Sequence, residues 1–221
     1  MATNYNLMSQ LVFKFPFKTK YYEQDYYVSS NNFSAYRLIE SWPNWPSKWV
    51  NIFGPKGCGK THLSNILKKK INLIHMIDAK KVDNEIISKF EKLDCLIIDN
   101  YEKNIDEKIF YSLLNQSKQS DSYLLVNSIL PLGNIKFDLK DLRSRTESFI
   151  NLGIELPTDD LLRVIISKSF SDKQIEITPK ISEYIVKNIE RSYEKVFKFI
   201  KEIDDLSLSS GKSININLIK K

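Results

Sequence analysis

The sequence contains little that would place the protein in a membrane, direct it for export or cross-link it. No apolar run approaches the ~20 residues that a membrane-spanning helix needs, and residues 1–6 lack the charged and apolar regions of a signal peptide. The two cysteines, Cys58 and Cys95, do not have the spacing of a metal site. We therefore expect a cytoplasmic protein with reduced thiols and no membrane partner.

Histidine and arginine are also scarce. His62 and His75 lie apart with no partner in the sequence, so we assign neither of them a catalytic role. Lysines and arginines together number 33, of which only five are arginines: Arg37, Arg143, Arg145, Arg163 and Arg191. Where lysine is the default cation, an arginine indicates a position at which a planar, permanently charged guanidinium group matters.

The composition is that of a folded, basic protein. Hydrophobic residues make up 42% of the 221 residues, which is enough to bury a core in one medium domain or a medium domain plus a small one. The formal net charge of +6 invites a nucleic-acid interpretation. The lysines are spread widely and form no long basic tail, so this charge gives only weak support for direct contact with DNA.

The most informative stretch follows an apolar, strand-like run at residues 49–53. It matches the G-x-x-x-x-G-K-[ST] pattern of a phosphate-binding loop in full and comprises Gly54, Pro55, Lys56, Gly57, Cys58, Gly59, Lys60 and Thr61. Glycines let the backbone turn tightly, so that several N–H groups and the positive end of the following helix point at one phosphate pair. We expect Lys60 to reach the β- and γ-phosphates and the Thr61 hydroxyl to bind Mg²⁺. The sequence therefore predicts a nucleotide-binding protein.

Two later apolar runs end in polar residues. Asp99 ends the first, and in phosphate-loop proteins such an aspartate holds Mg²⁺, usually through water. Residue 100, where ATPases of this type commonly place a second acid that activates the attacking water, is Asn100, which cannot take a proton. We therefore expect slow hydrolysis by the protein itself and lean against an enzymatic role. The second run ends at Asn127 and Ser128, and a polar side chain at that strand tip would lie near the γ-phosphate.

Strand-like and helix-like segments alternate along the first two thirds of the sequence. This order, with phosphate-binding residues at the strand ends, is typical of a doubly wound sheet. We predict an α/β fold with a mainly parallel, five-stranded sheet in a nucleotide-binding core over residues 21–156. From Pro157 the sequence becomes helical, with helix-start signals at Thr158 and at Thr178 before Pro179, so residues 157–221 are predicted to form a small helical lid.

Two segments before the phosphate loop have two interpretations each. Residues 1–20 are either a strap packed on the domain or an extended peptide that docks a glutamine and bulky apolar side chains into a pocket on another protein. The docking residues would be Gln10, Leu11, Phe13 and Phe15. Residues 21–46 are rich in aromatic side chains, which pack in the core, beside an adenine base, or both.

The order of these parts resembles that of an AAA+ ATPase. Within that superfamily, Gly-Lys-Thr-His-Leu at residues 59–63 and Leu-Arg-Ser-Arg at residues 142–145 are similar to the DnaA family of replication initiators. The chain ends at Lys221 after the expected lid, so we expect it to lack the helix-turn-helix DNA-binding domain of the initiators. This shorter layout with a glutamine peptide near the N-terminus is similar to the Hda family of DnaA-homologous regulatory inactivators.

The resemblance implies specific partners and roles. The N-terminal peptide would bind the DNA polymerase sliding clamp and reach DNA only through it, while the ADP- or ATP-bound core would dock on DnaA and promote hydrolysis of the ATP bound there. Residues 54–61 would bind phosphate, Asp99 would be the Walker B acid, Asn127 or Ser128 the first sensor, Arg145 an arginine finger offered in trans and Arg191 the second sensor. The choice between ADP and ATP, and whether the protein forms a homo-oligomer, are left open.

The main alternative is a self-contained DnaA-like or helicase-loader ATPase that hydrolyses its own nucleotide and acts directly on DNA. Asn100 and the N-terminal peptide favour the regulator, as does the expected lack of a DNA-binding domain. Strong ATPase activity without the clamp, or binding to single-stranded DNA without a partner, would favour the alternative.

Overall fold

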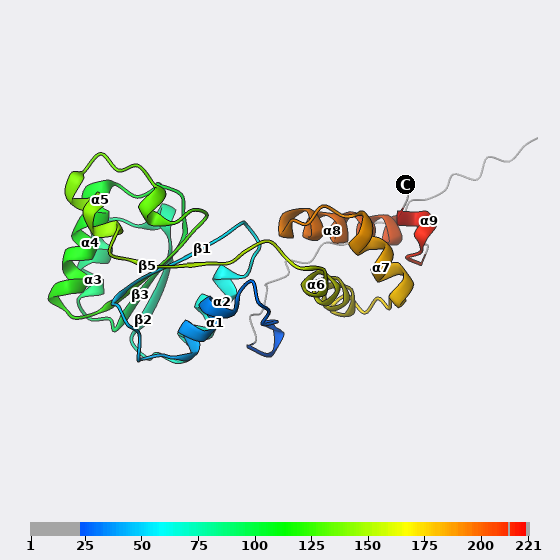
Figure 1. The fold of residues 1–221 in the computed structure, drawn as a ribbon, viewed down its shortest axis with the longest axis horizontal. Helices are drawn as coiled ribbons and strands as arrows, with labels where there is room; N and C mark the ends of the chain where they lie inside the picture. Colours follow the sequence, from blue (N-terminus) through cyan, green and yellow to red (C-terminus); the bar gives the residue numbers. More distant parts are fainter. Residues whose placement is uncertain (1–22, 212, 220–221) are drawn as a thin grey trace, which may run out of the picture. The chain divides into compact units, whose positions relative to one another are not determined.

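The computed structural model of the protein describes residues 23–211 and 213–219. Contacts within the chain divide it into two compact units, and the boundary falls between Leu156 and Pro157. The unit before this boundary is an α/β structure, and the unit after it is built of helices (Figure 1).

The α/β unit is built on five strands: β1 (Trp49–Phe53), β2 (Ile74–Asp78), β3 (Cys95–Tyr101), β4 (Tyr123–Ser128) and β5 (Ile150–Gly153). They lie in the order β2-β3-β4-β1-β5, and every neighbouring pair is parallel. The predicted α/β fold with a five-stranded sheet is confirmed, and the sheet is parallel throughout. Because the strands all run the same way, their carboxyl ends share one edge of the sheet, where ligands of doubly wound folds bind.

Helices cover both faces of this sheet. α1 (Phe33–Glu40) and α2 (Lys60–Lys68) lie on one face, and α3 (Glu85–Phe90), α4 (Glu107–Gln119) and α5 (Lys140–Thr146) lie on the other (Figure 1). Short 3-10 turns occur at η1 (Glu23–Asp25), η2 (Ala79–Lys81) and η3 (Leu132–Asn134). Because both faces are covered, the strands can be apolar along their whole length, and Leu96, Ile97 and Ile98 of β3 are fully buried.

Helix α4 shows how the sequence specifies this packing. The Asp106 carboxylate accepts hydrogen bonds from the backbone nitrogens of Lys108 at 2.9 Å and Ile109 at 3.2 Å, which satisfies donors that a helix start leaves free. Phe110 and Leu114, four residues apart on one side of the helix, are fully buried against the sheet. Burying a side chain of this kind stabilises the fold by about 1.5–3 kcal/mol.

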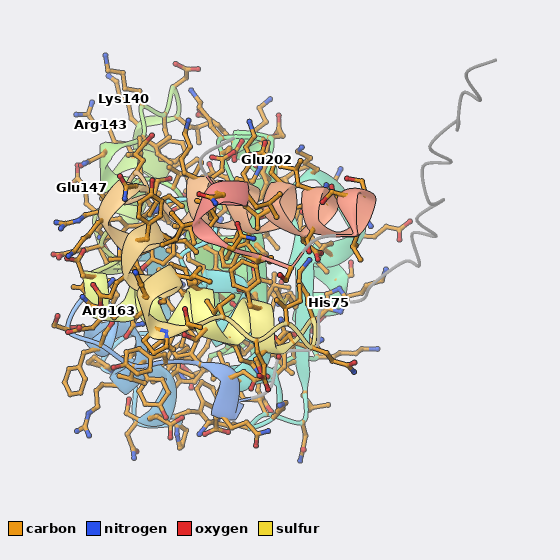
Figure 2. The ribbon with its side chains drawn as sticks, turned by 90° about the vertical axis from the view of Figure 1, so that its right-hand side faces the viewer. His75, Lys140, Arg143, Glu147, Arg163 and Glu202 are labelled. Carbon is orange, nitrogen blue, oxygen red and sulfur yellow. The ribbon has the colours of Figure 1, made fainter. Side chains whose placement is uncertain are left out.

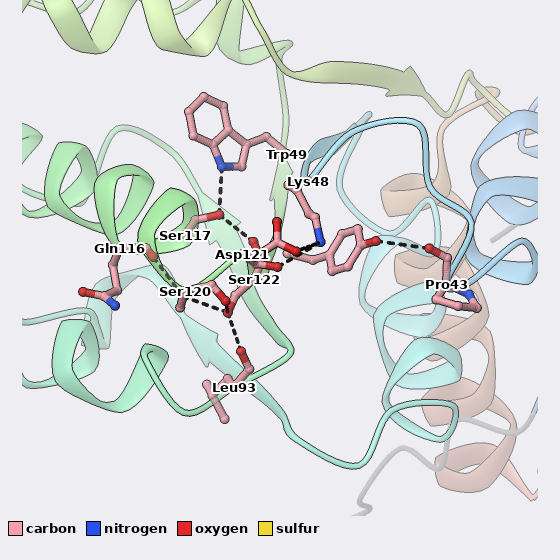
Figure 3. A network of polar contacts seen from close by, with 10 residues as sticks. Pro43, Lys48, Trp49, Leu93, Gln116, Ser117, Ser120, Asp121 and Ser122 are labelled. Carbon is pink, nitrogen blue, oxygen red and sulfur yellow. Dashed lines mark hydrogen bonds and ion pairs between the residues drawn. The ribbon is translucent and has the colours of Figure 1, made fainter.

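A polar network closes the amino-terminal edge of the sheet (Figure 3). The indole nitrogen of Trp49 donates to the Ser117 hydroxyl at 2.9 Å, and Ser117 donates to the backbone oxygen of Ser122 at 2.6 Å. The Ser122 hydroxyl in turn donates to the backbone oxygen of Leu93 at 2.6 Å. A buried polar group without such a bond costs about 1–3 kcal/mol, so the network stabilises this edge. A cavity of about 380 Å³, lined in part by Trp42, opens at the same edge and therefore away from the phosphate loop.

The second unit consists of α6 (Asp159–Ser171), α7 (Pro179–Asn188), α8 (Tyr193–Ser210) and the short α9 (Ile216–Ile219). The hydroxyls of Thr158 and Thr178 cap α6 and α7, accepting from the backbone nitrogens of Leu161 at 3.3 Å and Ile181 at 3.4 Å. Apolar side chains from all four helices form its core, among them Leu162, Ile166, Phe170, Ile185, Val196, Ile200 and Leu218. The helical character predicted after Pro157 is confirmed. Within the described part of the chain, none of the helices has the length and apolar character needed to cross a bilayer.

Candidate functional site

The phosphate loop connects β1 to α2 at the carboxyl edge of the sheet. Gly54 has a φ of 154° and Gly59 a φ of 101°, which side chains rarely adopt. A Cβ atom at Gly54 would lie 2.5 Å from the backbone oxygen of Ile154, and one at Gly59 would lie 2.9 Å from the ring of Tyr26. Both positions therefore require glycine, for the backbone angle and for space. The turn brings the N-terminus of α2, with its free N–H groups, to the loop, and such an end favours an anion.

Lys60, the first residue of α2, folds its side chain back over this loop. Its Nζ donates hydrogen bonds to the backbone oxygens of Gly54 at 2.7 Å and Pro55 at 3.0 Å, and lies 3.7 Å from the sulfur of Cys58. Phosphate oxygens are stronger acceptors for an ammonium group than neutral carbonyls are. Burial raises the pKa of the Cys58 thiol, and the nearby charge of Lys60 opposes that shift only in part, so the thiol stays neutral at pH 7.

Thr61 and Asp99 meet directly beside the loop. The Thr61 hydroxyl donates to Oδ2 of Asp99 at 2.8 Å, and Asp99 is only 5% exposed. Magnesium prefers a few hard oxygen ligands of this kind together with phosphate oxygens. The hydroxyl and the carboxylate therefore fit an Mg²⁺ ion, and these are the two residues that would hold it.

Asn127 and Ser128, the two candidates for the first sensor at the end of β4, have different hydrogen-bond partners. Asn127 donates from Nδ2 to Oδ1 of Asp99 at 2.9 Å and to the Ser64 hydroxyl at 2.7 Å. Ser128 instead donates to the backbone oxygen of Leu130 at 2.6 Å and accepts from the Asn51 amide at 2.8 Å. Asn127 is thus the strand-tip residue on the phosphate-loop side, and Ser128 belongs to a structural network.

Asn127 also carries an unsatisfied group. Its Oδ1 is buried and has no hydrogen-bond partner among the described residues. Buried polar atoms are nearly always paired, so an unpaired one beside a candidate site suits a ligand or a water that completes it. Sequence reasoning missed Ser64, whose only signal was its place one turn after the phosphate loop.

The end of β3 contains a second unexpected pair. Asn100 has a φ of 57°, and its Nδ2 donates to Oδ2 of Asp78 at 2.8 Å, while Oδ1 of Asp78 accepts from the backbone nitrogen of Lys80 at 2.9 Å. The hydrogen bond from Asn100 is the main cause that lowers the pKa of Asp78, and the Lys80 N–H adds to it. The sequence analysis assigned no role to Asp78, because nothing in the sequence shows that the end of β2 lies beside Asn100.

One residue of the aromatic segment at 21–46 lies beside the phosphate loop. The Tyr26 ring is stacked on Tyr36 with centroids 5.9 Å apart and meets His62 edge-on at 5.2 Å. The same ring is the one that contacts Gly59. This packing joins the segment to the start of α2. It explains the position of the Tyr26 ring without an adenine base stacked on it.

The two arginines before β5 have different surroundings. Arg145 is half-buried, because its guanidinium group lies 4.3 Å from the Tyr111 ring and donates hydrogen bonds to the Tyr111 hydroxyl and to Asn115, both on α4. Arg143 is exposed and lies with Lys140 and Glu147 on the outer surface of α5 (Figure 2). These contacts use two of the five N–H groups of the Arg145 guanidinium.

Two other predicted sites lie outside the α/β unit. Within the helical unit, Arg191 is exposed and pairs with Asp159 at 3.0 Å. The predicted clamp-binding residues Gln10, Leu11, Phe13 and Phe15 lie outside the described residues. Their roles stay predictions.

A parallel sheet with a phosphate loop after β1, an aspartate on β3 and a polar tip on β4, followed along the chain by a helical unit, is the layout of an AAA+ fold. The structure is similar to domain III of DnaA from Thermotoga maritima, with a TM-score of 0.75 and 17% identity over 93% of this chain and 96% of that chain. It is also similar to AMPPCP-bound DnaA from Aquifex aeolicus (TM-score 0.67, 22% identity, 88% of this chain, 68% of that chain). The chain therefore has a DnaA-like AAA+ fold.

Sequence comparison also finds similarity to DnaA proteins. The chromosomal replication initiator DnaA of Buchnera aphidicola subsp. Cinara cedri is 24% identical over 215 residues, which cover 86% of this chain and 48% of that protein. DnaA of Borrelia garinii subsp. bavariensis is 27% identical over 263 residues (95% of this chain and 54% of that protein). The chain spans about half the length of these curated relatives.

Other matches lie outside the initiators. The Holliday junction branch migration motor RuvB of Thermotoga maritima has a TM-score of 0.60 and 23% identity over 78% of this chain and 59% of that chain. A family model described as RNA helicase matches residues 50–140.

Proposed function

We propose that the chain binds ATP or ADP together with Mg²⁺ at the carboxyl edge of its sheet. The observation that carries this proposal is the convergence of Thr61, Asp99 and Asn127 on one point beside the phosphate loop. Lys60 reaches over the same loop and would transfer its hydrogen bonds to the phosphates. The AMPPCP bound to the similar Aquifex aeolicus DnaA supports the same choice of ligand for this chain.

We further propose that this nucleotide-bound core serves a regulatory role of the Hda type. The core would dock on ATP-bound DnaA, place Arg145 against the triphosphate of DnaA and promote its hydrolysis, while the N-terminal peptide binds the sliding clamp. A guanidinium group placed in trans stabilises the charge that develops on the transferring phosphoryl group, and in GTPases it contributes ~10³–10⁵ in rate. DNA would be reached only through the clamp.

The surroundings of Arg145 support a positioned rather than a mobile cation. Stacking on Tyr111 and the bond to Asn115 fix the plane of the guanidinium group on α4. A preorganised group loses less freedom when it enters the site of a partner, and it is more effective there. Its partial exposure leaves an edge that can face a docked subunit.

A second candidate function has some support of its own. The similarity to the RuvB motor and the match to an RNA helicase family model favour an ATPase that hydrolyses its own nucleotide and acts directly on DNA or RNA. Asn100, which cannot accept a proton from water, favours the regulator. The two candidates differ in whose triphosphate is hydrolysed.

The experiment that separates them follows radiolabelled ATP preloaded on DnaA, with clamp loaded on DNA, in the presence of the wild-type protein, Arg145→Ala or Arg143→Ala. We expect the wild-type protein to accelerate this hydrolysis and Arg145→Ala to lose about 10²-fold or more of the acceleration, the size of effect that follows removal of one preorganised donor. Arg143→Ala is the matched control on the same helix and should retain most of it. Normal stimulation by Arg145→Ala would show that the catalytic cation lies elsewhere.

A further inference from the structure

Strand β2 forms an edge of the sheet that the described part of the chain leaves open. It is the outermost strand in the order β2-β3-β4-β1-β5, and among the residues that the structure describes only β3 pairs with it. The backbone oxygen of Leu73 accepts hydrogen bonds from the backbone nitrogens of Asp94 at 2.8 Å and Cys95 at 3.3 Å, which identifies the side that faces β3. Backbone groups alternate between the two sides of a strand, so those of Ile74 and Met76 point to the open edge.

The opposite edge of the sheet is covered. Just after β5, the backbone nitrogen of Glu155 donates to the backbone oxygen of Asn31 at 3.1 Å, and the Asn31 side chain donates to the backbone oxygen of Leu156 at 3.1 Å. Helix α1 also packs against β5. An open edge is a template for pairing with another chain, and proteins commonly protect such edges with lysine or proline. Strand β2 contains neither of these residues.

Positive charge flanks the open edge at both ends. The residues that carry it are Lys68, Lys69 and Lys70 before β2 and Lys80 and Lys81 after it. Asp78 is the only acid between the first and the last of these lysines. Lys70 is paired with Glu40 at 2.8 Å, whereas both lysines after the strand are exposed. An extended segment laid along β2 would therefore meet positive charge at each of its ends, which favours acidic residues there.

We propose that the open edge of β2 is a docking surface for an extended, acidic peptide of a partner protein. The peptide would add a strand beside β2, with its backbone bonded to Ile74 and Met76 and its acidic ends beside the flanking lysines. In strand addition of this kind, main-chain hydrogen bonds give the affinity and side chains give the specificity. The proposal is independent of the nucleotide, because β2 contributes no residue of the phosphate loop.

The side chains at this edge favour apolar residues in the middle of the peptide. Leu73, which precedes β2, is 55% exposed, and Met76 is partly exposed. Because side chains alternate between the faces of a sheet, an added strand would cover apolar surface on both faces. A nucleic acid would use the lysines but would leave the backbone groups of the edge unpaired. The edge as a whole therefore fits a peptide better than a nucleic acid.

The test follows the amide signals of ¹⁵N-labelled protein by NMR during a titration with a synthetic peptide. In this peptide, alternating valine and threonine residues are flanked by glutamates, and it is added to about 1 mM, the range of weak binding. We expect the signals of Ile74 and Met76 to shift and their amide protons to exchange more slowly with solvent. The fully N-methylated peptide, which has no backbone donors, and a lysine-flanked peptide should leave both signals unchanged.

Charge reversal on the protein tests the flanking lysines separately. Lys80→Glu with Lys81→Glu should weaken binding of the glutamate-flanked peptide roughly tenfold and reduce its advantage over the lysine-flanked peptide. Lys180→Glu with Lys187→Glu, at exposed positions on α7, is the matched control and should bind the peptide as the wild type does. Met76→Pro removes an N–H group from the open edge and should abolish binding. If Met76→Pro does not fold, as judged by circular dichroism, the charge reversal decides the matter.

Several results would overturn the proposal. Unchanged signals of Ile74 and Met76 with the glutamate-flanked peptide remove it, and so do equal shifts with the methylated or lysine-flanked peptide. Equal affinity in Lys80→Glu with Lys81→Glu removes the acidic partner. A dimer of the wild type that buries the same two amides would assign the edge to a second copy of this chain. Shifts of these amides by a single-stranded DNA oligonucleotide would assign the lysines to nucleic acid.

Discussion

At the scale of single residues, the candidate site is organised by one buried carboxylate. Asp99 accepts hydrogen bonds from Thr61 and Asn127, and Asn127 also donates to Ser64. Hydrogen bonds to a charged group contribute about 1.5–3 kcal/mol each. Two strand tips and the first turn of α2 are therefore fixed relative to one another by three short contacts.

The Thr61 hydroxyl offers a direct test of the Mg²⁺ site. Thr61→Val keeps the shape of the side chain but removes the oxygen, so we expect the Mg²⁺-dependent part of ATP affinity to fall by about 10-fold or more, which corresponds to ~1.5 kcal/mol. Titrations of fluorescent ATP with and without Mg²⁺ measure the effect. Thr61→Ser retains the hydroxyl and should bind nearly as the wild type does. Equal affinity in Thr61→Val would mean that this oxygen does not contact the cation.

Single residues also show how far the sequence alone could go. The phosphate loop, Asp99 and the tip of β4 were predictable, because each is tied to a strand end by an apolar run. Asp78 was not predictable, since its bond to Asn100 depends on β2 and β3 being neighbours in register. The choice between Asn127 and Ser128 likewise required the direction of each side chain, which alternates along a strand.

At the scale of elements, α4 and the loop before α5 are joined by a single acid. The Glu107 carboxylate accepts hydrogen bonds from the backbone nitrogens of Leu139 at 2.8 Å and Asp138 at 3.0 Å. These bonds lower the pKa of Glu107, and the ion pair with Lys103 adds to the effect. The contact fixes the start of α5, the helix that carries Arg143 and Arg145.

This contact predicts a dependence of stability on pH. Because the folded pKa of Glu107 lies below its ordinary value of 4.5, the stabilisation is present above about pH 4.5 and is lost as the pH falls through the folded pKa. Glu107→Gln should therefore lower the free energy of unfolding by about 1 kcal/mol at pH 7, and the difference should vanish at low pH. Urea unfolding at several pH values measures it. Glu102→Gln, at an exposed side chain, is the control, and a pH-independent difference would contradict the assignment.

The elements themselves were largely predictable, and their partners were not. Apolar runs identified the strands, and the capping residues Thr158 and Thr178 identified helix starts to within a residue. The contact of Arg145 with α4 was invisible, because Tyr111 and Asn115 lie more than one element away in the sequence. The predicted arginine finger is thus held against α4 by its own chain.

At the scale of the whole molecule, the regulator account requires that the chain join two partners. The N-terminal residues 10–15 are predicted to bind the sliding clamp through a glutamine followed by apolar anchors, as in extended-peptide recognition. Gln10→Ala with Leu11→Ala should abolish capture of the protein by immobilised clamp while leaving ATP binding and the circular dichroism spectrum unchanged. Capture at wild-type affinity would remove the adaptor role and leave nucleotide binding unaffected.

The claim on which the others depend is that the phosphate loop holds a nucleoside triphosphate through Lys60. Equilibrium titration of fluorescent ATP into the wild type, Lys60→Ala and Lys56→Ala tests it most directly, since Lys56 carries the same charge in the same loop. We predict saturable binding by the wild type, a loss of about 10- to 100-fold in Lys60→Ala, and a much smaller change in Lys56→Ala. Absence of binding in the wild type, or equal affinity in Lys60→Ala, would contradict the account.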